Sequence, residues 1–213
     1  MVKSGLTVIG ENIHTTRVLR TNGKRVIRKE NGDDFVIYQN IDGITSFMPI
    51  PDFFKDTQVY KQGSVKHFMI AVTLGMSGLD QDRIHGENYI SAEIKRQEDR
   101  GSNFLDLNVD EISYKIDIQK KAMAWLIGHY SSVAKLPPCI DSSSVEIIQH
   151  GLECYRKVGS PQGPPMINSA SLERVSILDL VTENNAAAIV TASGIDSMPS
   201  EISDRMSNVS QII

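Results

Sequence analysis

The sequence predicts an α/β fold in which parallel strands alternate with helices. Short apolar runs that end in small polar residues recur along the chain, and stretches with helical spacing follow them. The clearest run spans residues 104–110, where Asp106, Asn108 and Asp110 share one face at period two. Alternation of strand and helix at intervals of roughly 20 to 35 residues indicates parallel strands joined by right-handed crossovers.

The composition fits one domain, residues 1–213, with a sizeable buried core. Of its 213 residues, 40% are hydrophobic, and the net charge is −4. This charge makes nucleic acid and anionic membranes unexpected partners. No run reaches membrane-spanning length and no signal peptide is recognisable, so we expect a cytoplasmic protein. Cys139 and Cys154 are expected to be free thiols in a reducing compartment.

The first strand is expected at residues 6–9, with a polar end at Gly10, Glu11 and Asn12. His14 then falls in a polar loop or at a helix start. Two interpretations of this histidine remain open: it acts as a proton carrier, or it is simply solvated, as most loop histidines are.

Between residues 19 and 83 the strand-helix rhythm is interrupted by an insertion. An Asn-Gly dipeptide at 31–32, between two β-rich arms, predicts an inserted hairpin. Two prolines argue against a regular helix or central strand at 47–54, so we expect an apolar loop there. That loop either packs on the main domain, which we favour, or forms a lid or a partner surface.

Helices are expected at residues 66–76 and 82–100, and further ones follow each later strand. The helix after residue 115 carries its apolar face on Ile116, Met123, Leu126, Ile127 and Tyr130. Ser143 and Glu146, three apart, predict a capping box for the next helix. Residues 172–181 predict another helix, and the tail from Pro199 has helical character.

Three later apolar runs end in short polar side chains, at Asp141, at Asn168 with Ser169, and at 191–193. Polar residues at the C-terminal ends of many strands are typical of a TIM barrel, and no glycine-rich phosphate loop favours a nucleotide-binding open sheet. A closed barrel needs eight strands, whereas five are recognisable. We therefore expect the N-terminal portion of a barrel, truncated after about five strands.

Four motifs carry a resemblance to a known family: Gly-Glu-Asn-Ile at 10–13, Leu-Asp-Leu-Asn-Val at 105–109, Cys-Ile-Asp-Ser-Ser at 139–143 and Met-Ile-Asn-Ser at 166–169. In this order they resemble strand-end motifs of the pterin-binding, dihydropteroate synthase-like family. More closely, they are similar to methyltetrahydrofolate:corrinoid methyltransferases and the folate domain of cobalamin-dependent methionine synthase. Dihydropteroate synthase has a Gly-rich Glu-Ser-Thr-Arg run in its second-strand motif, so the motif at 105–109 favours the methyltransferase branch.

The resemblance implies a (β/α)8 barrel whose mouth binds a reduced pterin, with Asp141 and Asn168 hydrogen-bonding the pterin ring. A carboxylate can accept two N–H bonds from the amidine-like edge of a pterin, and an amide supplies a donor and an acceptor. The expected pterin-binding residues are Asp141, Asn168, Asp106, Asn108, Glu11, Asn12 and Ser169, with no catalytic residue assigned and no metal expected. Helix N-capping is the alternative for Asp141 and Asn168, and structural hydrogen bonding for Asp106.

The implied reaction moves the N5-methyl group of methyltetrahydrofolate to a Co(I) corrinoid on a partner protein or domain. A dihydropteroate synthase-like enzyme and a non-catalytic pterin-binding module completed by another chain remain alternatives. We also expect a homo-oligomer. The Ser-Asn-Val-Ser run at 207–210 matches a seventh-strand motif of the family, but we interpret it as coincidence because it follows the fifth strand too soon.

Overall fold

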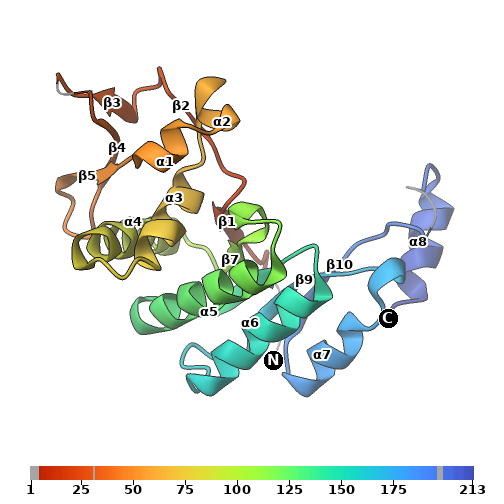
Figure 1. Cartoon of the computed structure of the whole chain (residues 1–213). Coiled ribbons are helices and arrows are strands. Elements are labelled where there is room, and N and C mark those ends of the chain that lie inside the picture. Colours follow the sequence, from red (N-terminus) through yellow and green to blue (C-terminus); the bar gives the residue numbers. More distant parts are fainter. Residues whose placement is uncertain (1–4, 31, 196–198) are drawn as a thin grey trace.

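A five-stranded parallel sheet, in the order β1-β7-β8-β9-β10, forms the centre of the molecule (Figure 1). The computed structural model describes residues 5–30, 32–195 and 199–213. The strands are β1 (Ile9–His14), β7 (Phe104–Asn108), β8 (Pro138–Asp141), β9 (Met166–Ala170) and β10 (Ala187–Val190). Within the described ranges β1 and β10 are the edges of this sheet, so it is open and resembles part of a TIM barrel.

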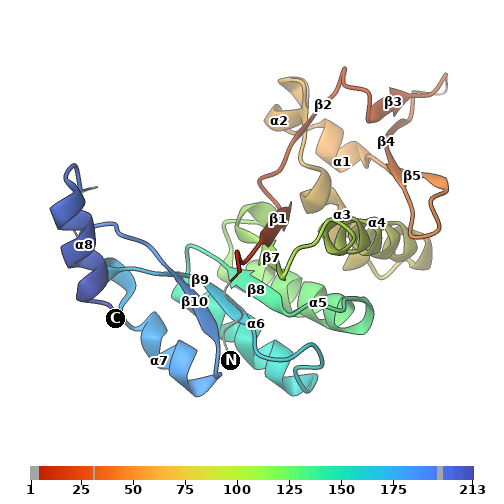
Figure 2. The same cartoon turned by 180° about the vertical axis from the view of Figure 1, so that it is seen from behind.

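Helices follow the strands as the sequence predicts. After β7, β8 and β9 come α5 (Ile116–Val133), α6 (Val145–Lys157) and α7 (Ile177–Glu183), which lie side by side along one face of the sheet (Figures 1 and 2). The helix α8 (Ile202–Ser210) follows β10 and contains the Ser-Asn-Val-Ser run, so that run is helical and does not end a strand. The predicted helix at 172–181 is divided into a 3-10 turn (Leu172–Arg174) and α7.

The strand register places an apolar row against these helices. Ile13, Leu107, Ile140 and Ile167 are aligned on successive strands, and each is at most 1% exposed. A Cβ added at Gly151 of α6 would lie 2.9 Å from Ile140 Cγ2, so this row faces the helix layer. Because successive side chains of a strand alternate in direction, the next residue of each strand points to the opposite face.

The insertion after β1 is larger than a hairpin. The strand β2 (Leu19–Arg20) pairs with β6 (Ser64–Val65), and β3 (Val26–Arg28), β4 (Asp34–Gln39) and β5 (Thr45–Pro49) form an antiparallel sheet. The β3-β4 pair confirms the predicted hairpin, although Asn31 of its expected turn lies outside the described residues. The short helices α1 (Asp52–Lys55) and α2 (Gln58–Lys61) complete the insertion.

The prediction of an apolar loop at 47–54 is wrong. Residues up to Pro49 belong to β5, and Asp52 begins α1. Proline is tolerated in β5 because this is an edge strand that pairs only with β4. The favoured packing of this segment is confirmed for Met48 and Phe54, which are 0% and 1% exposed.

The inserted sheet packs on α4 (Asp80–Glu98), which in turn packs on α3 (His67–Gly75); the sequence predicts both helices within a few residues. The rings of Tyr38 in β4 and Tyr89 in α4 meet edge to face, with centroids 4.9 Å apart. Val36 of the same strand is 0% exposed. The insertion therefore shares one apolar core with the helices that precede β7.

Two local predictions are corrected. The first strand runs over Ile9–His14 rather than 6–9, because its pairing with β7 is what fixes its extent, and Leu6 is 89% exposed. The capping box is not formed: Ser144 is the N-cap residue of α6 without a side-chain cap bond. Glu146 instead forms an ion pair with Lys120 of α5 at 2.5 Å.

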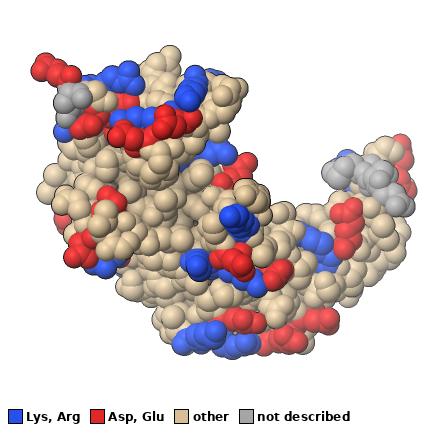
Figure 3. Space-filling view, in the orientation of Figure 1, with Lys and Arg blue, Asp and Glu red and all other residues tan. Residues whose placement is uncertain are grey.

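The outer surface carries both signs of charge. Figure 3 shows acidic and basic side chains interspersed over the face that it presents. No helix in the described part of the chain combines the length and apolar character needed to cross a bilayer. Cys139 is buried and Cys154 partly buried, and both are free thiols, as predicted.

Candidate functional site

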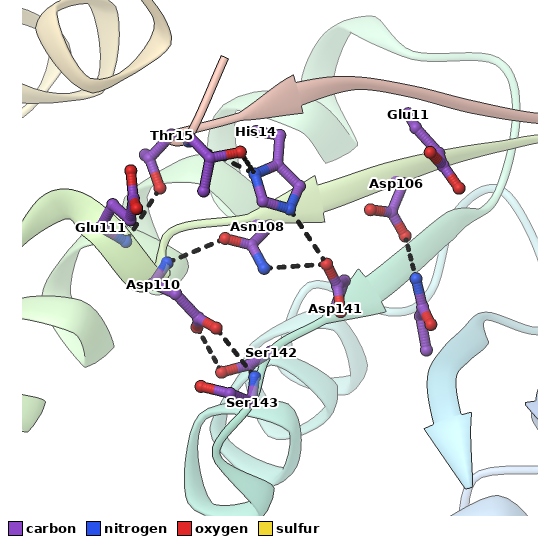
Figure 4. A network of polar contacts seen from close by, with 12 residues as sticks. Glu11, His14, Thr15, Asp106, Asn108, Asp110, Glu111, Asp141, Ser142 and Ser143 are labelled. Atoms are coloured by element: carbon purple, nitrogen blue, oxygen red, sulfur yellow. Dashed lines mark hydrogen bonds and ion pairs between the residues drawn. The ribbon is translucent and has the colours of Figure 1, made fainter. Parts of the chain in front are cut away.

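A row of polar side chains crosses four strands of the sheet near their C-terminal ends (Figure 4). The register aligns His14 with Asn108, Asn108 with Asp141, and Asp141 with Asn168. Each of these residues follows a member of the apolar row, so all four point away from the helices. Parallel pairing therefore brings together three of the predicted site residues and adds His14.

Asp141 occupies the middle of this polar row. Its Oδ2 accepts a hydrogen bond from Asn108 Nδ2 at 2.8 Å and lies 3.3 Å from His14 Nε2. The side chain remains 19% exposed, so a ligand can reach it. Because Ser144 is the N-cap residue of α6, the capping alternative for Asp141 is wrong.

Asp106 lies below the polar row, on the same face of β7 and aligned with Cys139 of β8. It is 1% exposed and accepts a hydrogen bond from Asn168 Nδ2 at 3.3 Å. Burial, and then repulsion from Asp141, raises the pKa of Asp106 to about 6. This carboxyl group therefore exchanges its proton close to neutral pH, unlike an ordinary aspartate.

Donor atoms of His14, Asp106 and Asp141 lie within 4.8 Å of one another. Nitrogen and oxygen atoms so placed could bind a divalent cation. Hydrogen bonds to Asn108 and Asn168 already account for the positions of both carboxylates, and we assign no metal to this cluster.

Asp110 joins the end of β7 to the loop after β8. Its carboxylate accepts hydrogen bonds from Ser142 Oγ at 2.5 Å and from Ser143 N at 2.8 Å. Its own N–H donates to Asn108 Oδ1 at 2.9 Å. Because Asn108 Oδ1 accepts this hydrogen bond, the Nδ2 atom of Asn108 is the one that faces Asp141.

Arg174 connects the ends of β8 and β9. Its Nη1 donates to the carbonyl oxygen of Ser142 at 2.9 Å, and its Nη2 donates to the carbonyl oxygen and Oγ of Ser169 at 2.8 and 3.1 Å. Ser169 is 8% exposed, so its hydroxyl group is engaged with Arg174 beneath the surface. This arginine joins the loop after β8 to the end of β9, beside the polar row.

Glu11 and Asn12 lie where the pairing of β1 with β7 is irregular. The register shifts between Gly10 and Ile13, as in a β-bulge. The Glu11 side chain is 60% exposed and forms an ion pair with Arg17 at 3.5 Å, and Figure 4 shows it on the same side as Asp106. The Asn12 N–H donates to Gln97 Oε1 of α4 at 3.2 Å.

Two cavities lie outside the polar row. A cleft of about 590 Å³ separates the inserted sheet from α4, and Arg25, Tyr38 and Arg96 are among its lining residues. A smaller pocket of about 340 Å³ lies beyond β10 and is lined by Thr191, Ala192, Ser193, Pro199 and Arg205. The row itself lies on the face of the sheet opposite α5, α6 and α7, where His14 and Asp141 are partly exposed and Asn108 is buried.

The fold defines a protein of parallel βα units, and the polar row is a candidate ligand site at its strand ends. A model of the family described as pterin binding enzyme matches residues 77–212, a region that begins before α4 and includes the strands β7 to β10. The chain therefore belongs to the pterin binding enzyme family. The family resemblance of the sequence is confirmed, and this membership supports the binding of a pterin or folate.

Three contributors to this site, His14, Asp110 and Arg174, were not among the residues expected to bind the pterin. The placement of His14 in a loop is wrong, because His14 is the last residue of β1 and its side chain is 18% exposed. A signal was present, since Ile13-His14 repeats the apolar-polar pair found at Leu107-Asn108 and Ile140-Asp141. The contacts of Asp110 and Arg174 join segments distant in sequence, and no local pattern indicates them.

Proposed function

We propose that the polar row binds the pterin ring of methyltetrahydrofolate and that the chain serves transfer of its N5-methyl group to a Co(I) corrinoid on a partner protein or domain. One observation carries the proposal: Asn108, Asp141 and Asn168 lie side by side on the face opposite the helices, in the order of the family's strand-end motifs. The Leu-Asp-Leu-Asn-Val motif on β7 supports the methyltransferase branch.

The donor and acceptor set of the row suits a pterin. Asp141 uses Oδ2 for Asn108 and His14, and its Oδ1 makes no hydrogen bond to the residues that the structure describes. That oxygen is available to accept N–H groups of the pterin edge. Asn168 provides an amide oxygen beside it, because its Nδ2 donates to Asp106.

Methyl transfer needs the pterin amine to become a better leaving group, which requires a proton or a strong hydrogen bond at N5. Asp106, whose pKa is raised to about 6, is a group of this site that can hold a proton near neutral pH. The corrinoid supplies the nucleophile in this reaction. The residues of this chain bind and orient the pterin.

The open sheet favours a second candidate function. Because β1 and β10 are sheet edges in the described part of the chain, another polypeptide could complete the sheet at these edges. In that case the chain is a pterin-binding module without catalysis of its own. A dihydropteroate synthase-like activity is a third possibility within the same family.

Calorimetric titration with methyltetrahydrofolate tests the binding site. We expect the Asp141→Asn variant to bind at least about tenfold more weakly than the wild type, since a charged hydrogen-bond acceptor is lost. Asp117→Asn, which changes an exposed carboxylate at the start of α5, is the matched control and should leave the affinity unchanged. Equal affinities of all three proteins would contradict the assigned site.

Incubation with cob(I)alamin and methyltetrahydrofolate, followed by absorbance detection of methylcobalamin, tests the reaction. Formation of methylcobalamin supports the proposed methyltransferase activity. Binding without transfer favours the module, and binding of a dihydropterin in preference to methyltetrahydrofolate favours the synthase-like alternative. If the wild-type chain binds neither pterin, the proposed function is wrong.

A further inference from the structure

His14 is the member of the polar row for which the proposed function has no task. Its Nδ1 lies 3.3 Å from the backbone N of Thr16 and 2.6 Å from Thr16 Oγ1. Its Nε2 lies 3.3 Å from Asp141 Oδ2. Both ring nitrogens therefore face partners on the protein, one in the following turn and one on β8.

These contacts determine which nitrogen carries the proton. A backbone N–H can only donate, so Nδ1 accepts from Thr16 and is unprotonated in the neutral ring. The ring proton is then on Nε2, the nitrogen that faces Asp141. A neutral His14 can thus donate to the Asp141 carboxylate without becoming charged.

We propose that His14 is a positioning residue that, together with Asn108, sets the rotation of the Asp141 carboxylate and leaves Oδ1 for the pterin. The Asn108 amide donates to Oδ2 at 2.8 Å, and the His14 Nε2 atom lies 3.3 Å from the same oxygen, which places both side chains against one side of the carboxylate. A carboxylate held through one oxygen presents the other in a defined direction, which lowers the ordering cost of binding. This inference rests on the proposed function, because it assigns Asp141 to the pterin.

The same geometry argues against two other roles. His14 is not placed to exchange a proton directly with the substrate, because Thr16 occupies one nitrogen and Asp141 the other. It is also unsuited to bind a cation between Asp106 and Asp141, because the Nε2 proton leaves no lone pair on that side of the ring. His14 therefore acts through Asp141.

Nitrogen-15 NMR of the histidine rings in the folded protein tests the tautomer without any ligand. We expect a protonated Nε2 and an unprotonated Nδ1 for His14, assigned by the signal lost in a His14→Gln variant. A neutral ring with its proton on Nδ1 would overturn the inference and leave the proposed function intact.

Titration of variants with methyltetrahydrofolate tests the positioning. His14→Leu, which cannot donate, should bind about tenfold more weakly, whereas His14→Gln, whose Nε2 amide can reach Asp141, should stay within about threefold of the wild type. In an Asp141→Asn background the His14→Leu change should have little further effect, because the two residues act as a pair.

The outcomes separate the two proposals. Equal losses for His14→Leu and His14→Gln, or additive losses with Asp141→Asn, would overturn the positioning role while pterin binding by the wild type stands. Thermal unfolding of each variant shows whether a loss of affinity reflects misfolding. If His14→Leu does not fold, the affinity of His14→Gln decides the test. Failure of the wild type to bind any pterin would overturn the proposed function and the ligand-directed part of this inference together.

Discussion

Asp106 carries a charge in an unfavourable place. It is 1% exposed, and Asp141 lies beside it on the neighbouring strand. Water is excluded from this position, and one amide donor from Asn168 replaces it only in part. The raised pKa of Asp106 is the consequence, and it makes the folded state prefer the protonated form.

Replacement of Asp106 by Asn should reveal the free-energy cost of ionising this buried carboxyl group. The pKa is raised from its ordinary value of 3.8 to about 6, so the stability contribution of the group is complete below 3.8 and is lost as the pH rises through about 6. We expect the free energy of unfolding of the wild type, relative to Asp106→Asn, to fall by about 1 kcal/mol from about pH 5 to about pH 7.5. Urea denaturation at both pH values measures it; an unchanged or increased difference would contradict the explanation.

Arg174 provides a second prediction for a single residue. It donates to Ser142, which follows β8, and to Ser169, which lies near the end of β9. Arg174→Ala should therefore lower the free energy of unfolding by about 2 kcal/mol, as expected for hydrogen bonds made by a charged group. Arg156→Ala in α6, which removes a more exposed arginine with one contact at 3.5 Å, is the control for chemical denaturation. Equal effects of the two substitutions would exclude a special role for Arg174.

At the scale of elements, α3 and α4 approach each other through glycines. A Cβ at Gly86 of α4 would lie 2.3 Å from the carbonyl oxygen of Ala71 and 2.4 Å from the nitrogen of Gly75. Both contacts involve backbone atoms of α3, which cannot move aside as a flexible side chain can. The close packing of these two helices therefore depends on the absence of a side chain at Gly86.

The Gly86→Ala substitution should force α3 and α4 apart and destabilise the protein by about 2 kcal/mol, because overpacking outweighs the better helix propensity of alanine. Gly128→Ala in α5 is the matched control, since a Cβ there meets no atom within 4 Å. It should raise the free energy of unfolding by about 0.5 kcal/mol or more. Circular dichroism during thermal unfolding of both variants gives the comparison, and a stabilised Gly86→Ala protein would contradict the packing argument.

At the scale of the whole molecule, the insertion and the parallel sheet share one core. Met48 of β5 is 0% exposed, and Tyr89 of α4 contacts Tyr38 of β4. The single tryptophan, Trp125, lies in α5 and stacks on His129. A Cβ added at Gly75 of α3 would lie 2.0 Å from its ring, so Trp125 reports on the packing of α5 against α3.

The Met48→Ala substitution in the insertion should destabilise the chain by roughly 2–5 kcal/mol, as for other large apolar side chains removed from a core. Because the core is continuous, Trp125 fluorescence and far-ultraviolet circular dichroism should show the same shifted transition. A fluorescence transition that stays at the wild-type position while circular dichroism changes would show that the insertion unfolds separately.

Much of this architecture could be predicted because it is encoded locally. The apolar-polar pairs Leu107-Asn108, Ile140-Asp141 and Ile167-Asn168 indicate both the strands and the face that carries the site. The extension of β1 to His14 was missed although Ile13-His14 is such a pair, because the irregular register at residues 10–13 separates this pair from the start of the strand. The β5 edge strand was missed for a similar reason: its position in the sheet is what makes Pro49 acceptable.

The alternation of the two rows has a consequence for how the gene can change. Ile13, Leu107, Ile140 and Ile167 face the helices, and the next residue of each strand faces the site. Gain or loss of one codon within such a strand would exchange these faces, burying a carboxylate or amide among apolar side chains and removing it from the site. In the turn at residues 40–43, which is mostly exposed, one added codon shifts no strand of the parallel sheet. Natural length variation should therefore accumulate in the insertion and be purged from the strands that carry the polar row.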